Sequence, residues 1–267
     1  MSRKALVVDI DYYQNGGNLF GCVNDAYSVN SVLARNSDGT RNFDVELMSG
    51  NGPDSSITRR QLKDKVSELF VGNDDIALFY FAGHGHFENT GGYLLTSECA
   101  DGDEGLPLKE IVELANRSRV RNKLIVFDSC HSGIAGNPRA GDAIANIGDG
   151  VTILTASSAD QYAVEKNNSG VFTTLFVDAL NGGAANLVGD VTPGSVYAHI
   201  DQSLGSWQQQ PLFKTNVERF ISLRKVQSPI SIDDLSKLTD IFTEDNFSIE
   251  LDPSFEPTCD ASTEENT

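Results

Sequence analysis

The chain has 267 residues, of which 39% are hydrophobic, and a formal net charge of −18 at pH 7. This length fits one large or two small domains with a buried core, and no apolar run approaches the ~18 residues of a membrane-spanning helix. The charge argues against binding to nucleic acids or to anionic membrane surfaces. The N-terminus leads into a predicted strand without the apolar stretch of a signal peptide, so we expect a cytoplasmic protein.

Strands and helices alternate along the chain. Their apolar spacing predicts strands over residues 4–9, 45–48, 76–81, 93–95, 124–127, 151–156 and 219–223. It predicts helices over residues 24–33, 56–70, 108–115, 171–180 and 193–204. This alternation is typical of the α/β class, with a mostly parallel sheet and helices on both of its faces.

Two stretches interrupt the pattern. Residues 134–150 are rich in Gly, Ala and Asn and predict a flexible surface loop. Residues 226–267 hold eleven acidic residues and one basic residue, Lys237, which predicts an acidic C-terminal tail. This tail is either a solvated terminus or an arm that docks on the body or on a partner. We therefore expect one domain over 1–225, with halves 1–133 and 151–225.

A cysteine and a histidine follow two of the predicted strands. Cys130 comes just after the strand 124–127, and His84 comes just after the strand 76–81. Parallel sheets present their chemistry at the carboxyl ends of strands. A thiol and an imidazole at neighbouring strand ends are the parts of a cysteine nucleophile with its base. Cys22 and Cys99 lack such neighbours, and we expect both to be buried, inert thiols.

Other side chains compete for these roles. His86 and His131 are rival bases, although His131 is adjacent to Cys130 and adjacent strand residues point to opposite faces. Two metal sites are also conceivable on residue chemistry, and both are weaker interpretations. Zinc would use His84, His86, Asp128 and Cys130, and calcium would use Glu98, Asp101, Asp103 and Glu104.

The motifs around these residues, taken together, resemble the caspase-like cysteine peptidases, and most of all the metacaspases and prokaryotic caspase-like proteases. The resemblance spans roughly residues 4–224 and is carried by five segments in order. They are Gly21–Ala26, Ala82–Gly85, Asp128–Gly133, Ala156–Gln161 with Gly170–Thr173, and Gln210–Lys214. It implies a caspase-like three-layer sandwich with a central sheet of about six strands.

The resemblance also implies roles for individual residues. Cys130 would be the nucleophile, His84 the base, and the backbone N–H groups of Gly85 and Cys130 the oxyanion hole. Asp25 and Asp128 would form an acidic pocket for the residue before the scissile bond, the P1 residue. Taken alone, Asp25 also fits a helix-capping role. Further pocket residues are Ser157 and Ala82, where metacaspases commonly carry serine.

These roles predict an endopeptidase that cleaves after Arg, and then Lys, since a planar guanidinium pairs bidentately with carboxylates. Arg139 and Lys166 are candidate self-cleavage sites in predicted flexible stretches. We expect a monomer that needs no cofactor, with calcium as an option, acting on a protein with an exposed basic loop. By analogy with prokaryotic relatives, that partner is a gasdermin-like effector in antiviral defence. The alternatives are a catalytically silent scaffold and a metal-dependent hydrolase.

Overall fold

The computed structural model describes residues 2–88, 91–100, 105–129, 146–156, 165–166, 169–204, 211–217, 219–242 and 244. Contacts within the chain divide it into two compact units, Met1–Pro229 and Ile230–Thr267. The larger unit contains the sheet and every predicted site residue.

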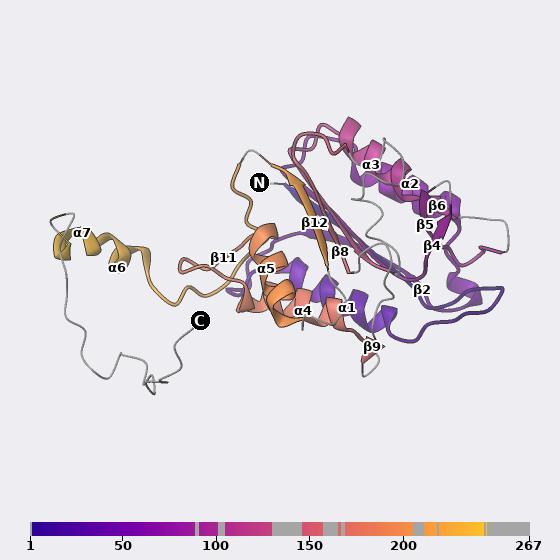
Figure 1. The fold of residues 1–267 in the computed structure, drawn as a ribbon, viewed down its shortest axis with the longest axis horizontal. Helices are drawn as coiled ribbons and strands as arrows, with labels where there is room; N and C mark the ends of the chain where they lie inside the picture. The colour runs from indigo at the N-terminus through magenta and orange to yellow at the C-terminus, as the bar shows by residue number, and fades with distance from the viewer. Residues whose placement is uncertain are drawn as a thin grey trace, which may run out of the picture. The chain divides into compact units, whose positions relative to one another are not determined.

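A six-stranded sheet with the order β12-β8-β7-β3-β1-β2 forms the centre of the larger unit (Figure 1). The strands are β1 (Arg3–Ile10), β2 (Asp44–Gly50), β3 (Ile76–Ala82), β7 (Asn122–Asp128), β8 (Val151–Thr155) and β12 (Leu212–Asn216). All neighbours pair in parallel except β12, which runs antiparallel to β8. The expected mostly parallel α/β sheet of about six strands is therefore confirmed.

Helices cover both faces of this sheet (Figure 1). One face packs against α1 (Cys22–Ala34), α4 (Val171–Asp178) and α5 (Pro193–Ser203). The other packs against α2 (Arg59–Leu69) and α3 (Leu108–Arg117). All seven residues of β3 are buried, because a central strand covered on both faces is apolar on both.

Shorter strands form small sheets of their own, and two irregular turns accompany them. The strands are β4 (Gly85–Glu88), β5 (Gly91–Leu94) and β6 (Leu106–Pro107), the pair β9 (Glu165–Lys166) and β10 (Ser169–Gly170), and the pair β11 (Asp190–Val191) and β13 (Arg224–Lys225). The turns are a 3₁₀ turn at Pro53–Ser55 and a wide helical turn at Ala179–Gly183 that follows α4. Only β5 among these strands was expected from the sequence.

The start of α2 differs from the prediction for a clear reason. Its N-cap is Thr58, whose side chain accepts a hydrogen bond from Gln61 N, while the Gln61 side chain accepts one from Thr58 N. This capping box satisfies amides at the first turn and fixes where the helix begins. Ile57 is buried just before the helix instead of within it.

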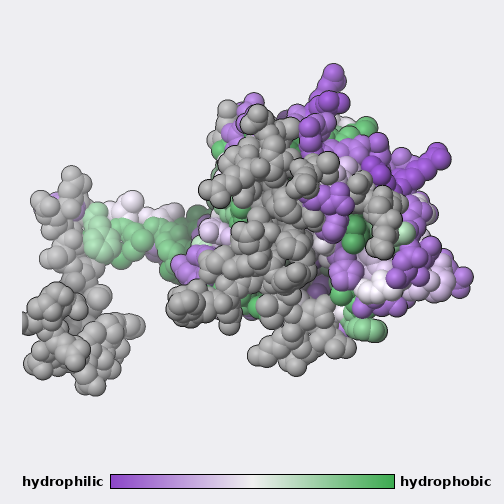
Figure 2. Space-filling model, turned by 45° about the vertical axis from the view of Figure 1, so that its right-hand side comes forward, coloured by the Kyte–Doolittle hydropathy of each residue, from purple (hydrophilic) through white to green (hydrophobic). Residues whose placement is uncertain are grey.

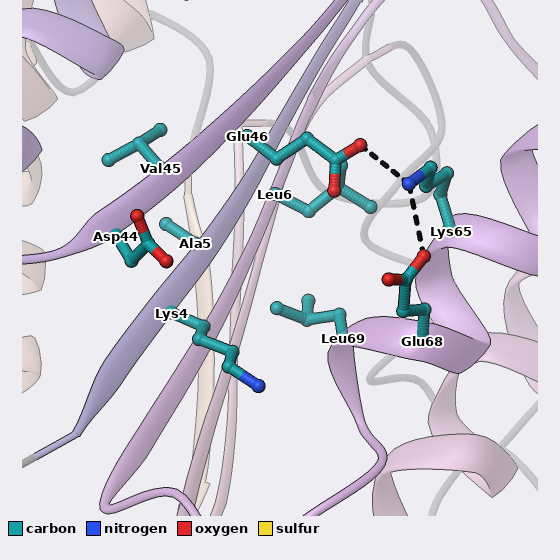
Figure 3. Close-up of a pocket in the computed structure, with 9 residues that line it drawn as sticks. All are labelled: Lys4, Ala5, Leu6, Asp44, Val45, Glu46, Lys65, Glu68 and Leu69. Atoms are coloured by element: carbon teal, nitrogen blue, oxygen red, sulfur yellow. Dashed lines mark hydrogen bonds and ion pairs between the residues drawn. The ribbon is translucent and has the colours of Figure 1, made fainter.

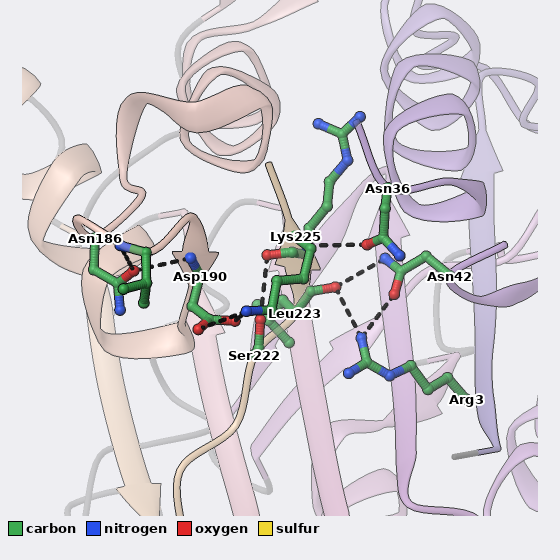
Figure 4. Close-up of polar contacts among 10 residues, drawn as sticks. Arg3, Asn36, Asn42, Asn186, Asp190, Ser222, Leu223 and Lys225 are labelled. Carbon is green, nitrogen blue, oxygen red and sulfur yellow. Dashed lines mark hydrogen bonds and ion pairs between the residues drawn. The ribbon is translucent and has the colours of Figure 1, made fainter. Parts of the chain in front are cut away.

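The strand predicted over residues 219–223 is wrong, and the last sheet strand is β12. Ile221 and Leu223 are buried while Phe220 is 68% exposed, so the alternation of a strand is present without a place in the sheet. Arg3 and Asn42 both donate to Leu223 O (Figure 4), and Leu223 N donates to Val191 O of β11 at 2.7 Å, outside the six-stranded sheet. Alternating burial shows which side chains pack, but does not show which backbone pairs with which.

The smaller unit carries two short helices, α6 (Ile232–Ser236) and α7 (Leu238–Ile241). Their apolar side chains Ile232, Leu238 and Ile241 are exposed, and this segment is green in Figure 2. In the part of the chain that the structure describes, no helix combines the length and apolar character needed to cross a lipid bilayer.

Candidate functional site

The parallel pairing of β3 with β7 sets the geometry of the site. Ala82 is the register partner of Asp128, so both strands end at the same edge of the sheet. The amide of Gly83 then donates to Asp128 O at 3.3 Å. His84 follows Ala82 by two residues, and in the sequence Cys130 follows Asp128 by two. Cys130 itself lies outside the described residues.

Two contacts fix the orientation of His84. Its backbone N–H donates to Tyr13 Oη at 2.7 Å, and the Tyr13 ring lies 4.7 Å from the imidazole, centroid to centroid. Its Nε2 atom lies 2.6 Å from Gly17 O. Because a carbonyl oxygen only accepts hydrogen bonds, Nε2 carries the proton and Nδ1 of the neutral ring is left as the basic nitrogen.

Glycine is required where the chain passes Tyr13. A Cβ atom at Gly83 would lie 2.8 Å from Tyr13 Oη and 2.9 Å from Phe81 Cζ. Any side chain at this position would push Tyr13 away from His84. Gly17 has a φ of +81°, a conformation that favours glycine, and this conformation aims its carbonyl at the imidazole.

Asp25 and Asp128 come together around one residue, as expected. Asp25 Oδ2 accepts a hydrogen bond from Gly170 N at 2.9 Å. A Cβ atom at Gly170 would lie 2.6 Å from Asp128 Oδ2 and 3.2 Å from Asp25 Oδ2. The two carboxylates are therefore neighbours, although they lie 103 positions apart in the sequence. Both are buried, with exposures of 3% and 8%.

A chain of hydroxyl groups supports Asp128. Thr173 Oγ1 donates to Asp128 Oδ2 at 2.6 Å, and Tyr80 Oη lies 2.5 Å from the same Thr173 oxygen. Since the Thr173 proton is directed at Asp128, Tyr80 is the donor to Thr173. Burial raises the pKa of Tyr80 well above its usual value, so this donor stays protonated. Hydrogen bonds of this kind favour the charged form of a carboxylate.

Asp25 is not the N-cap of α1, so the helix-capping role considered for it does not apply. The N-cap residue of α1 is Gly21, and the amide of Cys22, the first residue of the helix, donates to Asp11 Oδ1 at 3.0 Å. The Asp25 side chain reaches across to Gly170, next to the start of α4. Asp25 thus ties α1 to the second half of the chain.

A third carboxyl group, Asp9, lies at the same edge of the sheet. Asp9 pairs in register with Ala82, which is buried between Asp9 and Asp128. Asp9 Oδ2 accepts a hydrogen bond from Ser49 Oγ at 2.8 Å, while Oδ1 is buried with no partner among the described residues. Burial raises the pKa of Asp9 to about 6, against the lowering effect of Ser49 and with further increases from Asp11 and Asp25.

The two described cysteines, Cys22 and Cys99, are buried, as predicted. Cys22 is the first residue of α1 and is buried. Burial, reinforced by Asp11, raises the pKa of its thiol far above the usual value. Cys99 is also buried, and its sulfur accepts a hydrogen bond from Thr96 N at 3.1 Å. Neither thiol has the electropositive surroundings that create a nucleophile.

The remaining predicted residues have mixed outcomes. His86 lies in β4 instead of a loop, with Nε2 3.2 Å from Glu88 Oε1. Lys166 lies in β9, where its backbone pairs with Ser169, so the expected flexible stretch is wrong at this point. The described residues contain no group of three or more His, Cys, Asp or Glu side chains able to hold a metal ion. His131, Arg139, Ser157, Asp101, Asp103 and Glu104 lie outside the described residues.

A cavity of about 210 Å³ elsewhere in the larger unit is not part of this site (Figure 3). It lies between α2 and the first residues of β1, near the opposite edge of the sheet. Lys65 Nζ there forms ion pairs with Glu46 at 2.7 Å and Glu68 at 3.0 Å. Its charges are already paired, and none of the predicted site residues lines it.

Sequence reasoning missed Tyr13, Gly17, Thr173 and Asp9. Tyr13 and Gly17 lie in a loop without periodic spacing, and no local signal links them to His84. Asp9 was detectable in principle, because it ends a predicted strand and so meets the same strand-end criterion as Cys130 and His84.

Replacing Asp9 by Asn should change how stability depends on pH. The pKa of this carboxyl is about 6 when folded against 3.8 for the unperturbed group. At low pH the Asp9 carboxyl is protonated in both the folded and the unfolded state, so its raised pKa does not affect the free energy of unfolding. As pH rises through this window, the unfolded state ionises first, so the wild type loses up to about 3 kcal/mol of unfolding free energy. Asp9→Asn should lack this loss.

Urea unfolding at pH 4 and pH 7.5 measures this effect. We expect the stability of Asp9→Asn relative to wild type to improve between the two pH values. Ser49→Ala is a useful second variant, because the Ser49 hydrogen bond lowers the pKa of Asp9. Without this bond, the loss of unfolding free energy between pH 4 and pH 7.5 should be larger than in the wild type. A stability difference between Asp9→Asn and wild type that stays constant across the pH range would contradict the raised pKa.

Known proteins share this sequence pattern and this fold. The family model of the caspase domain matches residues 2–222. Metacaspase-1 of Mycosarcoma maydis is 27% identical over 198 residues, which cover 64% of this chain and 49% of that protein. Metacaspase-1B of Neurospora crassa is 26% identical over 204 residues, covering 64% of this chain and 46% of the relative. The chain thus spans about half the length of these curated relatives.

Solved structures share the fold at low sequence identity. Protein GSU0716 from Geobacter sulfurreducens superposes with a TM-score of 0.61 at 17% identity, covering 86% of this chain and 98% of that one. Caspase-1 from Spodoptera frugiperda gives a TM-score of 0.58 at 12% identity, covering 86% and 93%. Because the family match covers most of the chain and the sheet has the same architecture, this chain belongs to the caspase-domain family of cysteine peptidases.

Proposed function

We propose that this chain is a cysteine endopeptidase that cleaves after Arg and, second, after Lys. The observation that carries the proposal is the convergence of Asp25 and Asp128 on Gly170, at the sheet edge from which His84 extends. A basic P1 side chain placed between two buried carboxylates gains charge-assisted hydrogen bonds that a neutral or acidic one lacks.

The proposed chemistry uses Cys130 and His84. His84 Nδ1 takes the thiol proton, and the thiolate sulfur forms a bond to the substrate carbonyl carbon. The negative charge moves to the carbonyl oxygen. When the intermediate collapses, the C–N bond breaks and the imidazolium returns the proton to the leaving amine. Water then hydrolyses the thioester, with His84 again as base.

The oxyanion hole is proposed to use the amide of Gly85. The neighbouring amide of His84 is already committed to Tyr13 Oη at 2.7 Å and is not available to a substrate. Gly85, at the start of β4, has no side chain to obstruct a carbonyl group. By the family resemblance, the amide of Cys130 would be the second donor.

The proposal extends to a biological role. A protein with an exposed loop containing Arg or Lys would be activated by one cut, and a gasdermin-like effector in prokaryotic defence is the proposed case, by analogy with caspase-like relatives. A cleavage-site profile on a denatured proteome, followed by a native candidate partner, tests the two parts separately. We expect no added metal to be required, which an assay with and without chelator and calcium tests.

Peptide cleavage should depend on P1 charge. Matched fluorogenic peptides with Arg, Lys or Asp at P1 should be cleaved in the order Arg, Lys and then essentially none. Asp128→Asn should lower kcat/KM for the Arg peptide by about 10- to 100-fold, the usual worth of a charged hydrogen bond. Cys130→Ala should abolish turnover.

Two outcomes would contradict this expectation. Absence of Cys130-dependent turnover on all three peptides would favour the silent scaffold. Turnover that is lost with chelator and survives thiol alkylation would favour a metal-dependent hydrolase. Glu113→Gln, on the exposed side of α3, is a control for removing one negative charge.

Tyr13→Phe should lower kcat and leave KM nearly unchanged. The substitution removes the acceptor for the partly buried His84 N–H, and leaving such a group without an acceptor costs up to about 1–3 kcal/mol. Without this hydrogen bond the imidazole of His84 is less well positioned to act as the base, so we expect kcat to drop about 5- to 50-fold. Tyr27→Phe, at a residue that is 55% exposed on α1, is the matched control and should behave like wild type. Unchanged kcat in folded Tyr13→Phe would show that Tyr13 does not position His84.

Self-cleavage, if it occurs, should take place at Arg139 before Lys166. A peptidase needs an extended, unpaired backbone, and the Lys166 backbone is paired with Ser169. Intact mass after incubation should show the pieces 1–139 and 140–267 for the wild type and one uncut chain for Cys130→Ala. Arg139→Gln should remain uncut. A first cut after Lys166 would show that the paired strand opens readily.

A further inference from the structure

Asp9 and Asp128 point to the same face of the sheet and lie at the same level across its strands. Val7 packs in the core under α1, and Asp9, two residues further on, points to the same side of the sheet. Val126 and Asp128 have the same relation on β7. The registered partner of both aspartates is Ala82. The two backbones are about 10 Å apart, twice the strand spacing, and the intervening side chain is a single methyl group.

The strand order places Asp9 where this type of fold binds ligands. β1 lies between β2 and β3, and α1 and α2, which follow β1 and β2, lie on opposite faces of the sheet. The order therefore reverses between β1 and β3. In doubly wound sheets this switch point leaves a crevice outside the carboxyl ends of the two strands. Asp9 is at that end of β1, and His84 follows that end of β3.

The carboxyl group of Asp9 lacks a partner that its chemistry requires. Its side chain is fully buried, and Oδ1 accepts no hydrogen bond from any described residue. The charges of Asp11 and Asp25 act on it in addition, and no described Lys or Arg forms an ion pair with it. A buried carboxylate in this state is costly in a purely structural role. A cation with several N–H groups would remove the cost.

We infer that Asp9 is a third carboxylate of the P1 pocket, with its free oxygen accepting a hydrogen bond from the basic group held by Asp25 and Asp128. This inference rests on the proposed preference for basic P1 residues. A guanidinium has five N–H donors in a plane, enough to contact carboxylates on two sides. Ala82 places only a methyl group between Asp9 and Asp128. Asp9 is thus assigned to specificity and takes no part in bond breaking.

The test compares P1 arginine with P1 citrulline, a neutral side chain of the same shape. The full chain is assayed at pH 8, where Asp9 is ionised, on two peptides that differ only at P1. We expect Asp9→Asn to lower the Arg-to-citrulline ratio of kcat/KM by roughly tenfold, as for one charged hydrogen bond, with citrulline turnover within twofold of wild type. Asp44→Asn, an exposed charge on β2 that is paired with Arg41, is the matched control and should leave the ratio unchanged.

Each result has one meaning. Equal losses on both peptides would make Asp9 a structural residue and overturn the inference, as would an unchanged ratio in folded Asp9→Asn. If the wild type itself does not prefer Arg to citrulline, the result contradicts the proposed preference for basic P1 residues, on which the role of Asp9 rests. Should Asp9→Asn not fold, Asp9→Ser removes the charge in a smaller side chain. Asp9→Ser is then tested by inhibition. The ratio of inhibition by a peptide ending in argininal to inhibition by one ending in citrullinal is measured for this variant and compared with the same ratio for the wild type.

Discussion

The parallel pairing of β3 with β7 is the constraint on which the rest of the site depends. It puts Ala82 opposite Asp128, so the segments that follow the two strands leave the sheet side by side. A register shift of one residue would send Asp128 to the opposite face, since side chains alternate along a strand. Asp128 would then lose Thr173, and His84 would leave a different part of the edge. Nearly complete burial of both strands specifies this register, because the misplaced face would carry a carboxylate into the core formed with α2 and α3.

At this edge of the sheet, each of three carboxylates accepts a hydrogen bond from a neutral group of the protein. Gly170 N meets Asp25, the Thr173 hydroxyl meets Asp128, and the Ser49 hydroxyl meets Asp9. These donors are neutral, so they stabilise the carboxylates without cancelling their charge. These donors favour the charged form of each carboxylate, which is the form that attracts a cation.

Much of this arrangement was predictable from the sequence, for physical reasons. Buried strands are recognisable as apolar runs, and polar residues at their ends mark the functional edge of the sheet. This reasoning predicted Cys130, His84 and the α/β class. The pairing of Asp25 with Asp128 needed the family resemblance. The contacts of Tyr13 and Gly17 with His84 span about 70 positions through an irregular loop, and no local spacing encodes them. The segment 219–223 shows the converse error, because its burial alternates like a strand while its backbone is held by Arg3 and Asn42.

The hydrogen bond between Asp25 and Gly170 has a consequence for how this chain divides. Asp25 and Asp128 precede residues 134–150 in the chain, whereas Gly170 and Thr173 follow them. On the proposed function, a cut within residues 134–150 would leave the acids on one fragment and the groups that orient them on the other. The ladder between β7 and β8 would then join the fragments without a covalent link. Substrate choice would depend on their association and would disappear on dissociation even with both polypeptides intact.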